Sequence, residues 1–150
     1  MAQSLTKNYI HITFSTKYRE HSLQKEDLPE LFSYMAGILS NIDCMPIIVG
    51  GITDHVHVLC NLSKNITLAK MMEILKSNSS KWIKTKGSSY INFRWQDGYG
   101  AFSVSQSKVE IVRHYIQNQE EHHRQKSFQE ELLKFLDEYQ IEYNEEYLWN

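Results

Sequence analysis

The chain is poor in cysteine and proline and has no long hydrophobic run. Its 150 residues include 2 cysteines, 2 prolines and 6 glycines. Two cysteines are too few for a disulfide framework or a zinc knuckle, so we expect Cys44 and Cys60 to be reduced core thiols of a cytoplasmic protein. No apolar stretch approaches the roughly 20 residues of a membrane span, and the N-terminus lacks the apolar segment of a signal peptide. The sequence therefore predicts no contact with a membrane.

The sequence also lacks internal repeats, low-complexity tracts and any Pro- or Gly-rich linker that would mark a domain boundary. Its hydrophobic content of 41% and charged content of 23% are typical of a globular chain, and its length suffices to bury a core. We therefore expect a single domain over residues 1–150. Within it, residues 1–126 form the body, and residues 127–150 form an acidic helical tail to which we assign no function.

Charge of one sign is scarce in two stretches of the chain, although the net charge is only −2. Residues 64–86 contain six lysines against Glu73, whereas residues 127–150 contain seven acids against Lys134. Because this tail carries −6, residues 1–126 carry +4, which suits binding to nucleic acid. The lysines are either the solvated face of an amphipathic helix or contacts to a DNA backbone; we expect such contacts from Lys70, Lys76, Lys81 and Lys84.

The hydrophobic periodicity predicts an α+β protein with an antiparallel sheet. Alternating apolar residues indicate strands, and helical spacing of apolar residues indicates helices. We expect strands over residues 8–15, 45–52, 55–62 and 101–105, and helices over residues 29–42, 67–85, 108–121 and 127–139. This order is the split βαβ pattern of ferredoxin-like and RNA-recognition-motif (RRM-like) sheets. The pattern places helices on one face of the sheet and the third strand near its centre, followed by a C-terminal tyrosine-bearing helix.

The most informative motif is His55-Val56-His57 in the third predicted strand. Side chains at i and i+2 of a strand point to the same face, roughly 7 Å apart. Two imidazoles held in this way can bind one divalent ion or flank one phosphate. The alternative is a pair of hydrogen-bonded histidines in a half-buried strand. Asp54 is either a turn residue or a partner that orients one of the two imidazoles.

A second constellation, Tyr115 and Gln119, lies one turn apart on the helix predicted over residues 108–121. A phenol with a pKa near 10 is a poor nucleophile at neutral pH unless a cation stabilises its reaction. A divalent ion held by His55, His57 and the Gln119 amide oxygen could align a phosphodiester for attack by Tyr115. Mg²⁺ or Mn²⁺ suits this task, and the two imidazoles favour Mn²⁺. Glu120 or His123 could replace Gln119 as the third ligand.

Other polar and aromatic residues are weaker candidates. Trp95 lies in a predicted loop and could stack on a DNA base. Arg113, just before Tyr115, is a candidate phosphate contact. We expect the remaining histidines of this region to lie at the surface or to contact phosphate; they are His114, His122 and His123.

These motifs, taken in order and with their spacing, resemble the single-tyrosine HUH transposases of the smallest bacterial insertion sequences. The resemblance rests on His55-Val56-His57, on residues 76–82 and 95–99, and on residues 113–119. It implies a homodimer that binds hairpins in single-stranded DNA. It also implies that Tyr115 cleaves the strand to give a 5′-phosphotyrosine and a free 3′-OH, and that the reverse attack rejoins strands. A divalent metal assists and no nucleotide cofactor is needed, while the sequence leaves assembly of the site in cis or in trans open.

Two alternatives share this fold. One is a non-catalytic RRM-like nucleic-acid-binding module in which the histidines only pack or stack. The first and third predicted strands give it little support, because their aromatic residues are only Tyr9 and Phe14. The other alternative is a domesticated relative that processes repeated palindromes and no longer mobilises itself.

Overall fold

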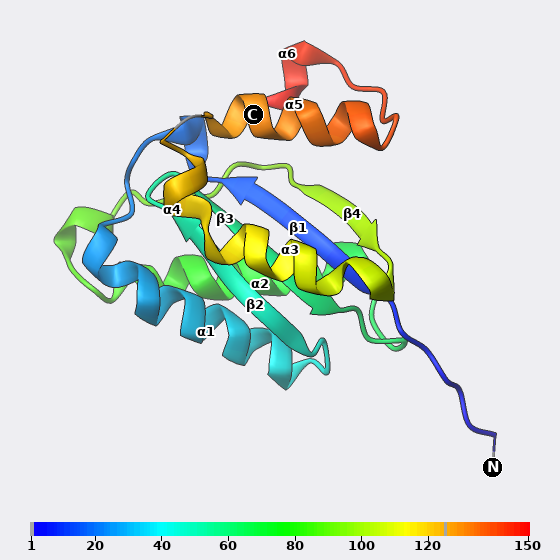
Figure 1. Cartoon of the computed structure of the whole chain (residues 1–150). Helices are drawn as coiled ribbons and strands as arrows, with labels where there is room; N and C mark the ends of the chain where they lie inside the picture. The colour runs from blue at the N-terminus through cyan, green and yellow to red at the C-terminus, as the bar shows by residue number, and fades with distance from the viewer. Residues whose placement is uncertain (1, 125) are drawn as a thin grey trace.

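The computed structural model describes residues 2–124 and 126–150, and it is built on a four-stranded antiparallel sheet (Figure 1). The strand order is β2-β3-β1-β4, so β3 and β1 are central. The strands are β1 (Tyr9–Ser15), β2 (Pro46–Ile52), β3 (His55–Asn61) and β4 (Gly100–Val104). This sheet confirms the predicted α+β fold class and the central position of the strand that carries the two histidines.

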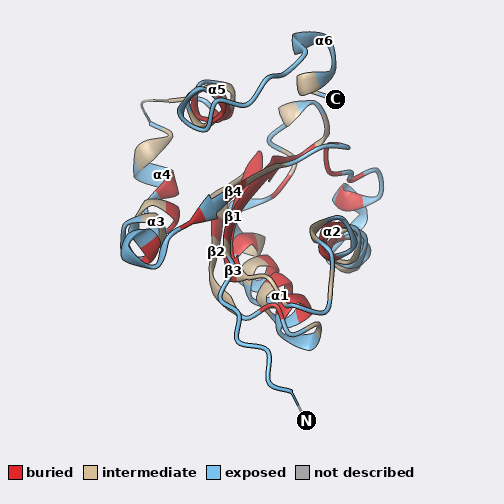
Figure 2. Cartoon of the chain, turned by 90° about the vertical axis from the view of Figure 1, so that its right-hand side faces the viewer, coloured by how far each residue is buried: buried red, intermediate tan, exposed pale blue. Residues whose placement is uncertain are grey.

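Helices cover both faces of the sheet (Figure 2). The two helices of the split βαβ pattern, α1 (Leu28–Asn41) and α2 (Leu68–Lys84), lie on one face, as expected. The tyrosine-bearing helix α3 (Val109–Gln117) and the tail helix α5 (Phe128–Glu138) lie over the other. Short helices are α4 (Gln119–His122), α6 (Glu145–Leu148) and 3-10 turns at Lys17–Arg19, Lys25–Asp27, Ser88–Tyr90 and Gln106–Lys108. No described helix has both the length and the apolarity needed to cross a membrane.

The period-two pattern of the central strands separates the hydrophobic core from the histidine face. Phe14 of β1 and Val56 and Val58 of β3 are fully buried in the core formed with α1 and α2. The alternating residues of β3, His55 and His57, are equally buried on the opposite face. The sheet therefore uses one face for stability and offers the other, under α3 and α5, as a polar site.

The helix predicted over residues 108–121 is interrupted, which corrects the sequence-based prediction of one continuous helix. Asn118 leaves helical geometry (φ −100°, ψ 26°) between α3 and α4. Asparagine is a weak helix former, because its side chain competes for backbone hydrogen bonds. A Cβ on Gly50 of β2 would lie 2.8 Å from the Ile116 carbonyl oxygen, so glycine there permits the close approach of α3 to the sheet. The break and this contact set the positions of Tyr115 and Gln119.

Candidate active site

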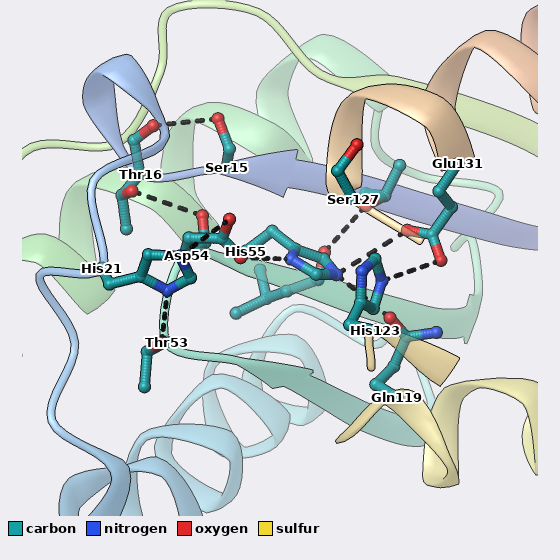
Figure 3. Close-up of polar contacts among 12 residues, drawn as sticks. Ser15, Thr16, His21, Thr53, Asp54, His55, Gln119, His123, Ser127 and Glu131 are labelled. Carbon is teal, nitrogen blue, oxygen red and sulfur yellow. Dashed lines mark hydrogen bonds and ion pairs between the residues drawn. The ribbon is translucent and has the colours of Figure 1, made fainter. Parts of the chain in front are cut away.

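The two histidines of the HxH motif point into a buried polar cluster beneath α4 and α5. His57 Nε2 lies 2.7 Å from Glu131 Oε1, and His57 Nδ1 lies 2.8 Å from His11 Nε2. His55 Nδ1 lies 2.6 Å from Asp54 Oδ1, and His55 Nε2 lies 3.0 Å from Gln119 Oε1 (Figure 3). Asp54 thus orients an imidazole as well as forming the turn, and its pKa is lowered by the contacts with His55, which outweigh the opposing effect of burial.

Glu131 of α5 is the residue at the centre of the site that the sequence analysis did not identify. Its side chain is 2% exposed, and its carboxylate accepts a hydrogen bond from the Tyr115 hydroxyl. Its Oε2 atom lies 3.1 Å from His123 Nε2 and 3.2 Å from His122 Nε2. Although burial alone raises the pKa of Glu131, the charge of His57 and hydrogen bonds from His123 and His57 hold it well below its usual range. Glu131 is therefore an ionised carboxylate inside the protein.

Tyr115 reaches the same cluster from α3. Its hydroxyl lies 3.1 Å from His122 Nε2 and donates to Glu131. Burial, followed by the negative charge of Glu131, raises the pKa of Tyr115 well above its usual range. The phenol is therefore protonated at neutral pH in this arrangement, and its use as a nucleophile requires a change in its electrostatic surroundings.

The donor set of the cluster fits a divalent metal ion. His55, His57, His123 and Glu131 each offer one ligand atom, and these atoms lie within 4.8 Å of one another. All four side chains are buried or nearly so. Imidazole nitrogens with a carboxylate oxygen are ligands of divalent transition ions in proteins. Gln119, the predicted third ligand, is 1% exposed and borders this set through His55, and its ligation stays a prediction.

Trp95 is in the core, which corrects its assignment as a base-stacking residue. Its side chain is 6% exposed and packs edge-on against Phe14 and Phe93. Its indole nitrogen donates to Ser79 Oγ at 3.0 Å. The sequence around Trp95 has no helical or strand periodicity, and a loop residue was therefore expected at the surface. The loop instead folds back over the core, so the indole has no free face for a DNA base.

Truncation of this side chain should unfold the protein more easily without a specific effect on DNA. Trp95→Ala is expected to lower the free energy of unfolding by about 3–5 kcal/mol, measured by urea denaturation, because it removes a buried aromatic ring. Trp95→Phe keeps most of the packing and should bind single-stranded DNA like the unmodified protein. A small stability change in Trp95→Ala together with weakened DNA binding by Trp95→Phe would contradict the core assignment.

Of the predicted DNA-contacting cations, Lys76 also has a different role. Its ammonium group is part-buried and donates to the carbonyl oxygens of Gln96, Asp97 and Gly98 at 2.7, 3.2 and 2.6 Å. It therefore ties the loop before β4 to α2 and is not a free phosphate contact. Lys70, Lys81 and Lys84 are exposed on α2, across the sheet from Tyr115. Arg113, on α3, contacts Glu110 and Gln117.

Burial lowers the pKa of Lys76 to about 8, from 10.5. Between these two pH values the unfolded chain binds the Lys76 proton more strongly than the folded chain does, so this group makes the free energy of unfolding rise with pH. After a discount for partial exposure to solvent, we expect unmodified protein to gain about 1–2 kcal/mol over Lys76→Met between pH 8 and pH 10. Urea denaturation of both proteins at several pH values measures this gain, and a pH-independent difference would contradict it.

Residues 4–119 match the protein-family model described as "Transposase IS200 like". The fold and the matched residues thus define a transposase-type protein. Because the match covers most of the sequence, the chain belongs to the IS200-like transposase family. None of the curated proteins matches the chain.

The fold is similar to that of two solved structures. One is a Deinococcus radiodurans R1 protein described as a candidate transposase, with a TM-score of 0.61 and 21% identity, covering 79% of this chain and 98% of that one. The other is a REP-associated tyrosine transposase bound to a REP hairpin, with a TM-score of 0.52 and 10% identity, covering 79% of this chain and 68% of that one. At these identities the likeness concerns the fold. His123 and Glu131 lie beyond the residues that match the family model.

Proposed function

We propose that this protein is a transposase that cleaves and rejoins single-stranded DNA at hairpin-marked ends, with Tyr115 as the nucleophile. The observation that carries the proposal is the position of the Tyr115 hydroxyl. It lies in the same buried cluster as His55 and His57, although the residues come from α3 and β3. A phenol beside a candidate metal site is the arrangement that transfer of a strand to tyrosine requires.

In the proposed reaction the Tyr115 oxygen forms a bond to the scissile phosphorus, and the bond from phosphorus to the 3′ oxygen breaks. The phenol loses one proton and the departing 3′ oxygen gains one, so the exchange is balanced. It leaves a 5′-phosphotyrosine and a 3′-hydroxyl. The phosphodiester energy is kept in the new bond, so a 3′-hydroxyl from another strand can reverse the step without a nucleotide cofactor.

The other residues of the site position these groups. Asp54 fixes the ring of His55, and His11 contacts the far nitrogen of His57. His55 and His57 would hold a divalent ion, Mg²⁺ or Mn²⁺ in the original expectation. When bound, this ion supplies a positive charge that polarises the phosphodiester. Replacing the free negative charge beside Tyr115 with a compensated one would also favour loss of the phenol proton.

The proposal extends to the DNA and to assembly. Exposed Lys70, Lys81 and Lys84 are proposed to contact the backbone of the hairpin, in a sequence-independent and salt-sensitive manner. A homodimer is proposed from the resemblance, with cytoplasmic action on the DNA of its own element. The RRM-like binding module is disfavoured, because α3 and α5 cover the sheet face on which such a module would stack bases.

A strand-cleavage assay tests the proposal. The protein is incubated with Mn²⁺ and an end-labelled single strand that carries a hairpin from the ends of its own element. We expect a labelled species that migrates with the protein on a denaturing gel, together with a shorter strand that ends in a 3′-hydroxyl. The fully duplex form of the same sequence should not be cut. Binding without cleavage in the presence of Mn²⁺, Mg²⁺ or other divalent ions would contradict the proposed activity.

A further inference from the structure

The geometry points to a different ligand set from the one expected from the sequence. We propose that the divalent ion is held by His55, His57, His123 and Glu131, so that the tail helix α5 supplies a metal ligand. This inference deepens the proposed function and takes its biological meaning from it. It predicts a transition-metal ion in place of Mg²⁺, and it makes metal binding and the docking of α5 one event.

The distances between the ligand atoms are those of a compact site. Ligand distances of about 2.1 Å around a tetrahedral ion place neighbouring ligand atoms about 3.4 Å apart. Glu131 Oε1 lies 2.7 Å from His57 Nε2 and 3.7 Å from His55 Nε2, and Glu131 Oε2 lies 3.1 Å from His123 Nε2. These separations lie on both sides of 3.4 Å, so small side-chain movements bring all four groups around one ion. No backbone rearrangement is needed.

The hydrogen bonds of His55 also favour a cation at this place. Its Nδ1 faces the Asp54 carboxylate at 2.6 Å, and its Nε2 faces the Gln119 oxygen at 3.0 Å. The side chain is fully buried, and a neutral imidazole has only one N–H to donate. With the N–H directed at Asp54, the Nε2 lone pair meets a second acceptor oxygen. A metal ion on Nε2 removes this conflict, and the Asp54 contact is the one that a metal-bound histidine ordinarily makes.

Gln119 is held in a different role by its own contacts. Its amide nitrogen donates to the Tyr115 carbonyl oxygen at 3.2 Å, which fixes the orientation of the amide. Its oxygen is a neutral ligand, whereas Glu131 brings a full negative charge into a site with little water. The ion is therefore neutralised better by Glu131. Gln119 is a positioning residue that links α4 to the chain beside Tyr115.

Three imidazoles and one carboxylate select among ions. Mg²⁺ prefers six oxygen ligands, keeps several waters and dehydrates reluctantly, which a buried histidine site does not allow. Zn²⁺ and Co²⁺ accept three histidines and a carboxylate, and affinity for such sites rises from Mn²⁺ to Zn²⁺ along the usual series. We therefore expect Zn²⁺ and Co²⁺ to bind more tightly than Mn²⁺, and Mg²⁺ to bind much more weakly than all three.

Cobalt titration of the full metal-free chain tests the ligand set without any DNA. Four-coordinate Co²⁺ absorbs visible light far more strongly than six-coordinate Co²⁺, so the spectrum reports the coordination directly. Loss of a residue that only supports a ligand costs 10–100-fold in metal affinity. Glu131→Gln and His123→Ala are therefore expected to weaken Co²⁺ binding by about 100-fold or more and to lose the strong band. Asp137→Asn, an exposed acid on the same helix, and Gln119→Ala should keep both.

Circular dichroism of each variant shows that it is folded, and Glu131→Asp keeps the charge as a second variant at the same position. A folded Glu131→Gln with unchanged Co²⁺ affinity, or a large loss in Gln119→Ala, would overturn the ligand set. Competition by Mg²⁺ as strong as that by Zn²⁺ would also overturn it. If Co²⁺ binds as expected while no DNA strand is cleaved, the proposed function fails and the metal site stands.

Discussion

Replacing Tyr115 by phenylalanine is expected to reduce strand cleavage by at least about 10³-fold and to abolish the covalent protein–DNA species. The substitution removes one hydroxyl and leaves the ring in its contacts with His57 and Phe135. It also leaves Glu131 with its histidine partners, so the folded structure should persist. The cleavage rate is measured with excess protein over a labelled hairpin-bearing strand, in the presence of Mn²⁺.

Tyr139→Phe is the matched control for this experiment. Tyr139 is exposed on the tail, and its hydroxyl donates to the Ser103 carbonyl oxygen at 3.0 Å, away from the histidines. Its variant should cleave at the rate of the unmodified protein. Equal amounts of covalent species from Tyr115→Phe and the unmodified protein would show that another group is the nucleophile.

The second large effect is expected at His57. We expect His57→Gln to lower the cleavage rate by about 10²–10³-fold at saturating DNA, since it removes one of the two strand histidines that would hold the ion. Glutamine can still donate to Glu131, so the substitution avoids leaving a buried carboxylate unpaired. Binding of the hairpin, measured by fluorescence anisotropy, should change less than threefold.

His114→Gln is the control for a histidine on the same face of the molecule that takes no part in the cluster. His114 is exposed on α3, one residue before Tyr115. Its variant should retain the full rate. A loss of hairpin binding by His57→Gln as large as its loss of rate would assign His57 to DNA binding or to folding, and would contradict its role at the metal.

The fold and half of the site could be predicted because they follow from local periodicity. The two-residue period of β3 places His55 and His57 on one face and Val56 and Val58 on the other. The spacing of residues 108–121 predicts a helix that carries Tyr115. Sequence periodicity does not show how closely that helix approaches the sheet, which depends on Gly50 and Ile116.

Glu131 was missed because its importance depends on a tertiary contact. An acidic residue in an acidic helix is ordinarily solvated, and residues 127–150 carry seven acids. One local signal was present, since Glu131 lies among Phe128, Leu132 and Phe135 on the apolar stripe of α5, where the helix packs. An ionisable residue in such a stripe has to find a partner inside the protein. His123 was weighed only as a substitute for Gln119, because the break at Asn118 was not foreseen.

Trp95 and Lys76 failed for a related reason. Residue type and local exposure suggested contact with DNA, but both side chains hold the loop before β4 against α2. A lysine stem and an indole both carry large apolar surfaces, so either can serve a core as well as a ligand. Only the path of the loop between Lys86 and Gly100 decides between the two, and that path has no periodic signal in the sequence.

The central claim is that Tyr115 becomes covalently joined to the 5′ phosphate of the cleaved strand. The most direct test is mass spectrometry of the protein after reaction with a hairpin-bearing strand, nuclease trimming of the bound DNA and proteolysis. The account predicts one modified peptide, with the added mass of a 5′-linked nucleotide on Tyr115. The same mass on any other residue, or cleaved DNA with no modified peptide, would contradict it.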